Sequence, residues 1–246
     1  MAAEPLVTLE EVGKTFPNGT TALAGMSVAI GAHEFVSFLG PSGCGKSTAL
    51  RMIAGLAAPS TGRIRWSDRG ERAPEIGFVF QEPTLMPWTT VAKNVYLPLK
   101  LQGIAFGEAR PRIEEALARV GLADFHDAYP RELSGGMKMR VSIARALVTK
   151  PQVLLMDEPF AALDEMTRAK LNDDVLELWR ANQWTVIFVT HSVYESVYLS
   201  SRIVVMAARP GRVVDEIAID APYPRTEAFR MSETYNEHCR RVSRAL

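Results

Sequence analysis

The sequence lacks the features that mark several large classes of protein. Its two cysteines, Cys44 and Cys239, are too few for a disulfide framework, and neither has partners at a metal-ligand spacing. Its 28 basic and 28 acidic residues cancel, which argues against a broad electrostatic attraction for nucleic acid or for an anionic bilayer. No apolar run approaches the roughly 18 residues that a membrane-spanning helix needs. The chain therefore does not resemble a disulfide scaffold, a polybasic nucleic-acid binder or a membrane-spanning protein.

What is present is the composition of an ordinary globular protein. Hydrophobic residues make up 47% and charged residues 23% of the 246 positions, and this length suits one large domain or a core with a smaller insertion. The opening, Met1-Ala-Ala-Glu-Pro5, has neither the charged nor the apolar region of a secretory signal. We therefore expect a cytoplasmic protein whose partners recognise a local surface.

Residues 40–48 fill every fixed position of the phosphate-binding loop pattern, and they follow the apolar run Phe35–Leu39. The glycines let successive backbone N–H groups turn towards one anionic centre. Lys46 adds a cation at the β and γ phosphates, the Ser47 hydroxyl can bind Mg²⁺, and Thr48 completes the cradle near the α phosphate. An ordinary glycine-serine turn is the alternative, but the lysine-serine-threonine ending at a strand-to-helix turn disfavours it. The predicted nucleotide-binding residues of this loop are Gly40, Pro41, Ser42, Gly43, Cys44, Gly45, Lys46, Ser47 and Thr48.

Two adjacent carboxylates, Asp157 and Glu158, follow a second apolar run at residues 153–156. In a phosphate-loop protein, ligands gather at the carboxyl ends of the strands, so Asp157 can face the same Mg²⁺ as Ser47. Glu158 can then accept a proton from the attacking water. An acidic pair that merely precedes a helix is the alternative for these two residues taken in isolation.

The motif at residues 133–137 has no catalytic side chain. Ser134 precedes Gly135 and Gly136 at the start of a predicted helix, which creates an anion site of bare N–H groups, a hydroxyl and the positive end of the helix dipole. A serine cap with flexible glycines would explain the helix alone. One nucleotide, however, hardly needs two complete phosphate cradles from one chain.

The pattern of elements changes twice along the chain. Short β-rich runs and one helix occupy residues 6–80, helical periodicity dominates residues 83–131, and helices then alternate with buried strands. Continuous apolar strands separated by helices indicate an α/β fold with a mostly parallel sheet covered on both faces. The predicted strands are residues 6–9, 27–30, 35–39, 63–66, 76–80, 153–156, 186–189 and 203–206, and the predicted helices are residues 46–56, 136–148 and 168–179.

With these motifs in this order, the chain resembles an ATP-binding cassette (ABC) ATPase over nearly all of its length. The loop around Lys46 matches the first nucleotide motif of that family, Asp157 and Glu158 match the second, and residues 133–137 match the family signature. The resemblance implies a P-loop NTPase core with an antiparallel β portion near the N-terminus and an inserted helical subdomain. It also implies ATP and Mg²⁺ as ligands.

Further matches follow in the family's order. Gln81 resembles the glutamine that touches Mg²⁺ and the attacking water, Asp164 ends a segment that resembles the crossing loop, and His191 resembles the histidine that senses the γ phosphate. Phe16 stands where the family places an aromatic ring under adenine. Taken alone, Gln81 would be a solvated strand end and His191 a capping residue before a helix. The neighbouring motifs favour the functional roles.

The resemblance implies one ABC ATPase domain over residues 1–246. Its nucleotide-binding core would comprise residues 1–82 and 136–219, its helical subdomain with the signature residues 83–135, and a C-terminal extension residues 220–246. By the same resemblance, the cradle at residues 134–136 closes on ATP held by a second copy of the chain, which implies a homodimer with two composite sites.

Residues 81–95 and 190–213 resemble importers of the nitrate, sulfonate and taurine type. This implies a separate transmembrane permease, a substrate-binding protein and a position at the inner face of the membrane. It implies no nucleic-acid partner. Leu85, Met86 and Trp88 could form a docking groove for a partner helix, or they could be ordinary core residues of the subdomain.

The alternative functions are a non-transport ABC ATPase acting on nucleic acid or ribosomes, and a nucleotide-binding regulator without turnover. The regulator is expected to lose Glu158 or His191, and both are present.

Overall fold

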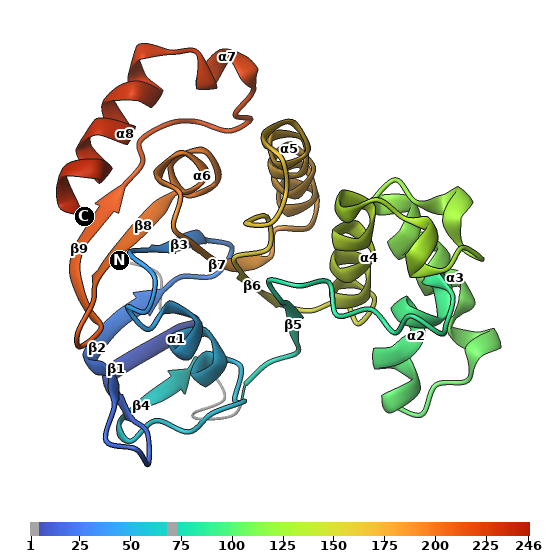
Figure 1. Ribbon diagram of the computed structural model, residues 1–246, viewed down its shortest axis with the longest axis horizontal. Helices are drawn as coiled ribbons and strands as arrows, with labels where there is room; N and C mark the ends of the chain where they lie inside the picture. Colours follow the sequence, from blue (N-terminus) through green and yellow to red (C-terminus); the bar gives the residue numbers. More distant parts are fainter. Residues whose placement is uncertain (1–4, 68–72) are drawn as a thin grey trace. The chain divides into compact units, whose positions relative to one another are not determined.

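The computed structural model describes residues 5–67 and 73–246. The chain divides into two compact units: the first comprises Met1–Pro74 and Trp179–Leu246, and the second Glu75–Leu178 (Figure 1). No helix within the described residues is long and apolar enough to cross a membrane.

The first unit contains an antiparallel sheet of strand order β2-β1-β4. Its strands are β1 (Val7–Thr15), β2 (Thr21–Ile30) and β4 (Thr61–Trp66). Inward-facing side chains on β2 such as Met26, Val28 and Ile30 are buried and alternate with exposed positions, as expected of a half-buried strand. The prediction of a strand only at residues 27–30 was too short, because Gly25 and a register shift near Met26 interrupt the alternation.

A second set of strands in this unit surrounds β3 (Phe35–Leu39), all five residues of which are buried. The strand pairs in parallel with β7 (Thr185–Thr190) on one side and with β8 (Arg202–Ala207) on the other. Strand β9 (Arg212–Ala218) continues beyond β8 in antiparallel pairing. The sequence did not predict β9, because only Ile217 of its residues is buried and charged residues occupy its middle, as in many edge strands.

The described part of the first unit also contains the helices α1 (Lys46–Ile53), α6 (Val193–Leu199), α7 (Glu227–Arg230) and α8 (Glu233–Ala245). Helix α8 buries Tyr235, Cys239 and Val242, which recur every three or four residues on one face. It packs beside α6, and α6 in turn packs on β3 and β7 (Figure 1).

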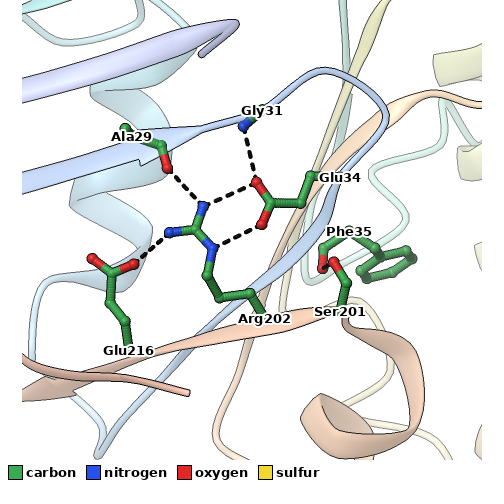
Figure 2. A network of polar contacts seen from close by, with 7 residues as sticks. All are labelled: Ala29, Gly31, Glu34, Phe35, Ser201, Arg202 and Glu216. Atoms are coloured by element: carbon green, nitrogen blue, oxygen red, sulfur yellow. Dashed lines mark hydrogen bonds and ion pairs between the residues drawn. The ribbon is translucent and has the colours of Figure 1, made fainter. Parts of the chain in front are cut away.

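Arg202 on β8 joins three segments of the first unit (Figure 2). Its guanidinium donates two hydrogen bonds to the carboxylate of Glu34, at 2.7 and 2.9 Å, and a third to the carbonyl of Ala29 at 2.6 Å. It also pairs with Glu216 on β9. Such bidentate, charge-assisted bonds are stronger and more directional than neutral ones. They fix the turn before β3 against the edge of the sheet.

Arg225 fastens the C-terminal segment to α6. Its side chain is only 5% exposed, and Nη1 donates to the carbonyls of Val197, Tyr198 and Ser200 at 2.8–3.0 Å. The carbonyls of a last helical turn have no partner within the helix, so the guanidinium acts as a cap. The ring of Tyr223 covers its other side, with the guanidinium carbon 4.2 Å from the ring centroid.

We predict that Arg225→Met destabilises the protein by about 1–3 kcal/mol, because it leaves several buried carbonyls without a donor. Thermal or denaturant unfolding of the full chain measures this loss. Arg241→Met removes an exposed arginine of the same segment and serves as the matched control. Equal unfolding midpoints for the two variants would contradict the capping role.

The second unit pairs two short parallel strands, β5 (Ile76–Val79) and β6 (Val153–Asp157). Its helices are α2 (Val91–Leu101), α3 (Phe106–Arg119), α4 (Gly135–Leu147) and α5 (Glu165–Asn182), the last of which runs on past the unit boundary at Leu178. Two 3₁₀ turns, Ala123–Phe125 and Pro130–Glu132, lie between α3 and α4. Buried Asn94 fixes the segment before α2, since its side chain accepts from the N–H of Met86 at 2.7 Å and donates to the Met86 carbonyl at 3.2 Å.

Candidate active site

The strand register of the first unit brings two predicted site segments to one edge. Leu39 of β3 pairs with Thr190 of β7 on one side and with Val205 of β8 on the other. The next residues along the chain are Gly40, which opens the phosphate loop, and His191. Both therefore leave the sheet at the carboxyl ends of adjacent parallel strands, where ligands bind in open α/β sheets.

The loop after β3 has the backbone of an anion cradle. Gly43 and Gly45 adopt φ angles of +79° and +89°, which side chains other than glycine rarely permit. A Cβ atom on Gly43 would meet no heavy atom within 4 Å, so this part of the loop is open. Helix α1 starts directly after Gly45 without a side-chain cap and without an acidic residue in its first turn. Its N–H groups and positive dipole end therefore suit a phosphate.

Lys46 lies beneath this loop. Its side chain is 4% exposed, and Nζ donates to the carbonyls of Gly40 at 2.8 Å and Pro41 at 3.1 Å. The bonds keep the cation at the cradle. Burial raises the pKa of the neighbouring Cys44 thiol, and the Lys46 charge opposes that rise. Cys44 therefore remains a buried neutral thiol.

Phe16 and His191 are exposed, in contrast to the lysine. Phe16 follows β1 with 41% of its surface exposed, and the Lys14 ammonium lies 5.8 Å from its ring centroid. His191 lies in the short turn between β7 and α6. Ser192 caps α6 by accepting the N–H of Glu195 at 3.3 Å.

The second unit carries Gln81 just after β5, and Asp157 and Glu158 at the end of β6. Val79 of β5 pairs with Met156 of β6, so Gln81 and Glu158 each lie two residues beyond a paired position. Asp157 is 6% exposed. Glu158 has a φ angle of +46°, a left-handed conformation that costs a residue with a side chain about 1–2 kcal/mol. Such strain persists where the surrounding structure holds it and is concentrated at functional sites.

The motif at residues 133–137 forms the start of α4. Ser134 is its cap, with Oγ accepting the N–H of Met137 at 3.3 Å. Ser134 and Gly135 are exposed while Gly136 is buried. The hydroxyl and the first N–H groups of α4 are therefore at a surface that another molecule can reach.

Gly136 is buried because α5 lies against it. A Cβ atom there would lie 2.7 Å from Cγ2 of Thr167, whereas one on Gly135 would meet Leu163 at an ordinary 3.5 Å. Asp164 accepts the N–H of the same Thr167 at 2.9 Å, and this bond holds the pKa of the Asp164 carboxyl below its usual value. The capping bond also explains why α5 begins at Glu165, three residues before the predicted start. The residues 161–164 and the start of α4 thus pack together through Thr167.

Gly136→Ala is expected to lower the stability of the chain by about 1–3 kcal/mol, because the stiff, β-branched Thr167 cannot move aside without strain. Thermal unfolding measures the loss, and Gly135→Ala, which has room, is the control. Adding Thr167→Ser removes the opposing methyl group and should restore stability to Gly136→Ala. A double variant as unstable as the single one would contradict this packing.

A glycine-rich loop between a buried parallel strand and a bare helix N-terminus, with a lysine folded beneath it, defines a P-loop nucleotide-binding protein. Residues 23–161 match the ABC transporter family. The chain belongs to that family.

Relatives and solved structures agree with this assignment. A putative ATP-binding protein of Brucella abortus is 48% identical over 230 residues, which cover 93% of this chain and 88% of the relative. The aliphatic sulfonates import ATP-binding protein SsuB of Bacillus licheniformis is 43% identical over 229 residues, covering 91% and 89%.

Two solved structures share the fold. The protein cbiO1 of Clostridium perfringens, part of the ABC transporter complex cbiONQ, has a TM-score of 0.81 at 29% identity and covers 98% of this chain and 97% of its own. The ATP-binding cassette MJ0796, solved as a dimer in a post-hydrolysis state bound to ADP and Pi, has a TM-score of 0.77 at 34% identity and covers 88% and 100%. The predicted P-loop core and the family are therefore confirmed, and the chain is an ABC ATPase.

Proposed function

We propose that this chain is the ATPase subunit of an importer for a small solute, of the nitrate, sulfonate and taurine type, and that it works as a homodimer on a transmembrane permease. The observation that carries the proposal is a complete set of turnover residues together with an exposed signature motif in the same chain. The likeness to SsuB supports an importer and a sulfonate-like solute. A substrate-binding protein would deliver the solute, and the ATPase would attach to the inner face of the membrane through the permease.

In this proposal, residues 40–48 bind the triphosphate and Phe16 stacks on adenine. Ser47, Asp157 and Gln81 would hold Mg²⁺. They offer the hydroxyl, carboxylate and amide oxygens that this ion accepts. Within the described residues, no group of three or more histidine, cysteine or acidic side chains is placed to hold a metal ion. When bound there, the ion would neutralise charge on the phosphates.

The remaining roles concern the attacking water and the γ phosphate. Glu158 accepts a proton from the water as it attacks, and the strained turn at this residue supports a role that depends on its orientation. His191 donates a hydrogen bond to a γ-phosphate oxygen, and its exposure leaves the ring accessible to a ligand. Lys46 supplies the fixed positive charge at the β and γ phosphates.

The exposed Ser134 cap would meet ATP bound to a second copy of the chain. Its hydroxyl, the helix N–H groups and the helix dipole would all face the γ phosphate of the other copy. ATP then stabilises the dimer, because it contacts both copies, and hydrolysis removes part of those contacts. The dimeric state of MJ0796 supports this arrangement.

Glu158→Gln should lower steady-state phosphate release by about 10²- to 10⁴-fold, because the amide cannot accept the water's proton. ATP binding should persist, so the variant should accumulate as a dimer in saturating Mg-ATP during analytical sedimentation. A variant that remains monomeric under these conditions would contradict the dimer, and one that hydrolyses at the normal rate would contradict the role of Glu158.

A groove in the second unit supports permease docking. It has a volume of about 510 Å³, and its lining includes Phe78, Phe80 and Leu101, the last with 80% of its surface exposed. Arg145 at its side donates to the carbonyls of Pro83 and Thr84, at 2.8 and 2.9 Å, and so fixes the adjoining segment. An exposed apolar groove with a polar edge suits an amphipathic helix of a partner. We assign it to a cytoplasmic helix of the permease.

Leu101→Asp should prevent recovery of the permease when the ATPase is purified from solubilised membranes, and it should abolish uptake without altering ATP binding, since the charge lies only in the groove. Met231→Asp introduces the same charge at another exposed apolar residue and should leave recovery intact. Equal recovery with both variants would reject the groove as the docking site. Recovery of only nucleic acid or ribosomes with the unmodified chain would reject the importer itself.

A further inference from the structure

A buried hydroxyl and a buried carboxylate flank His191. Thr190, the last residue of β7, is 2% exposed, and Glu195, in the first turn of α6, is 8% exposed. The hydroxyl of Thr190 donates to Oε2 of Glu195 at 2.5 Å and accepts the backbone N–H of Ser192 at 3.0 Å. These two contacts join both sides of the turn that carries the histidine.

The chemistry of the groups fixes the direction of each bond. A carboxylate has acceptors only, so the single hydrogen of the Thr190 hydroxyl goes to Glu195. The lone pairs of the same oxygen are then available to the N–H of Ser192. Glu195 therefore orients the Thr190 hydroxyl that holds the backbone of this turn.

His191 is the middle residue of this side-chain-to-backbone turn. The bond from Ser192 to Thr190 closes a short ring around it, and such threonine turns restrict the backbone within them. Glu195 itself is held in place, because Ser192 Oγ accepts its N–H and because α6 packs on β3, β7 and α8. The exposed His191 thus lies on a backbone segment that two buried side chains, Thr190 and Glu195, hold in place.

We propose that Glu195 and Thr190 are positioning residues for His191: they hold its backbone so that the imidazole meets the γ phosphate in the reactive geometry. This inference rests on the role of His191 proposed above. Neither residue needs to touch the nucleotide, and their loss is expected to affect turnover more than ATP affinity, which resides mainly in residues 40–48. Displacement of a catalytic group by about 1 Å can reduce a rate by about 100-fold.

The test compares Thr190→Val with Thr190→Ser, because valine has the shape of threonine without the hydroxyl and serine keeps the hydroxyl. For Thr190→Val we expect kcat to fall about 10- to 100-fold with KM for ATP unchanged within about twofold. Thr190→Ser should retain most of the activity. Steady-state phosphate release by the full chain gives both constants, and Glu195→Gln should lower kcat in the same direction by a smaller factor, since its amide oxygen can still accept.

The same substitutions in a His191→Ala background separate positioning from general stability. If the frame acts through His191, Thr190→Val and Glu195→Gln should lower kcat no further once the imidazole is gone. Additive losses, or a full kcat for Thr190→Val in the unmodified background, would overturn the inference. Should Thr190→Val not fold, the Glu195→Gln pair gives the same comparison, with the exposed Glu237→Gln as control.

The two proposals fail in different ways. If His191→Ala by itself keeps the normal kcat, the proposed role of His191 is wrong and the frame has nothing to position. If His191→Ala lowers kcat while the frame variants do not, His191 acts as proposed and the inference about Thr190 and Glu195 is wrong.

Discussion

The parallel pairing of β3 with β7 and β8 is the constraint on which the phosphate-binding half of the protein depends. A strand buried at all five positions can satisfy its backbone only by pairing on both sides. That pairing aligns the carboxyl ends of the strands, so the loop at Gly40 and the turn at His191 begin side by side. The same pairing brings β8 close to the loop, so that a Cβ atom on Gly40 would collide with the carbonyl of Met206. A residue with a side chain does not fit at Gly40, because the adjacent strand leaves no space for a Cβ atom.

In the second unit, parallel strand pairing positions predicted site residues in the same way. Strands β5 and β6 are short, and their parallel register delivers Gln81 and Glu158 to corresponding positions. The strained backbone of Glu158 is tolerated because buried residues on either side of it, Asp157 and Phe160 among them, anchor the turn. Thr167 contacts both the start of α4, through its side chain, and the segment before α5, through its backbone N–H. Packing against Thr167 thus helps to hold the signature motif in place.

The sequence was sufficient to predict the site motifs that are contiguous along the chain. The phosphate loop, the acidic pair after residues 153–156 and the serine cap at Ser134 are contiguous patterns, and each lies on the expected type of element. Strand β9 was not predicted because this edge strand buries only one residue and otherwise has the polar pattern of a loop. The Arg225 cap and the Thr190–Glu195 frame escaped for a different reason. The roles of these residues depend on contacts with groups that are distant in the sequence or buried in the fold. From the sequence alone, such an arginine or glutamate cannot be distinguished from a solvated one.

Arg225 has a practical consequence for anyone who shortens this protein. The last residues look dispensable, since they follow every nucleotide motif and carry many exposed charges. Yet trimming at residue 220 would remove the Arg225 cap from the end of α6, the short helix that begins two residues after His191, and would remove the hydrogen bond from Tyr235 to the carbonyl of Tyr194. A shortened chain must therefore retain this tail if the helix next to His191 is to keep the contacts it has in the full protein.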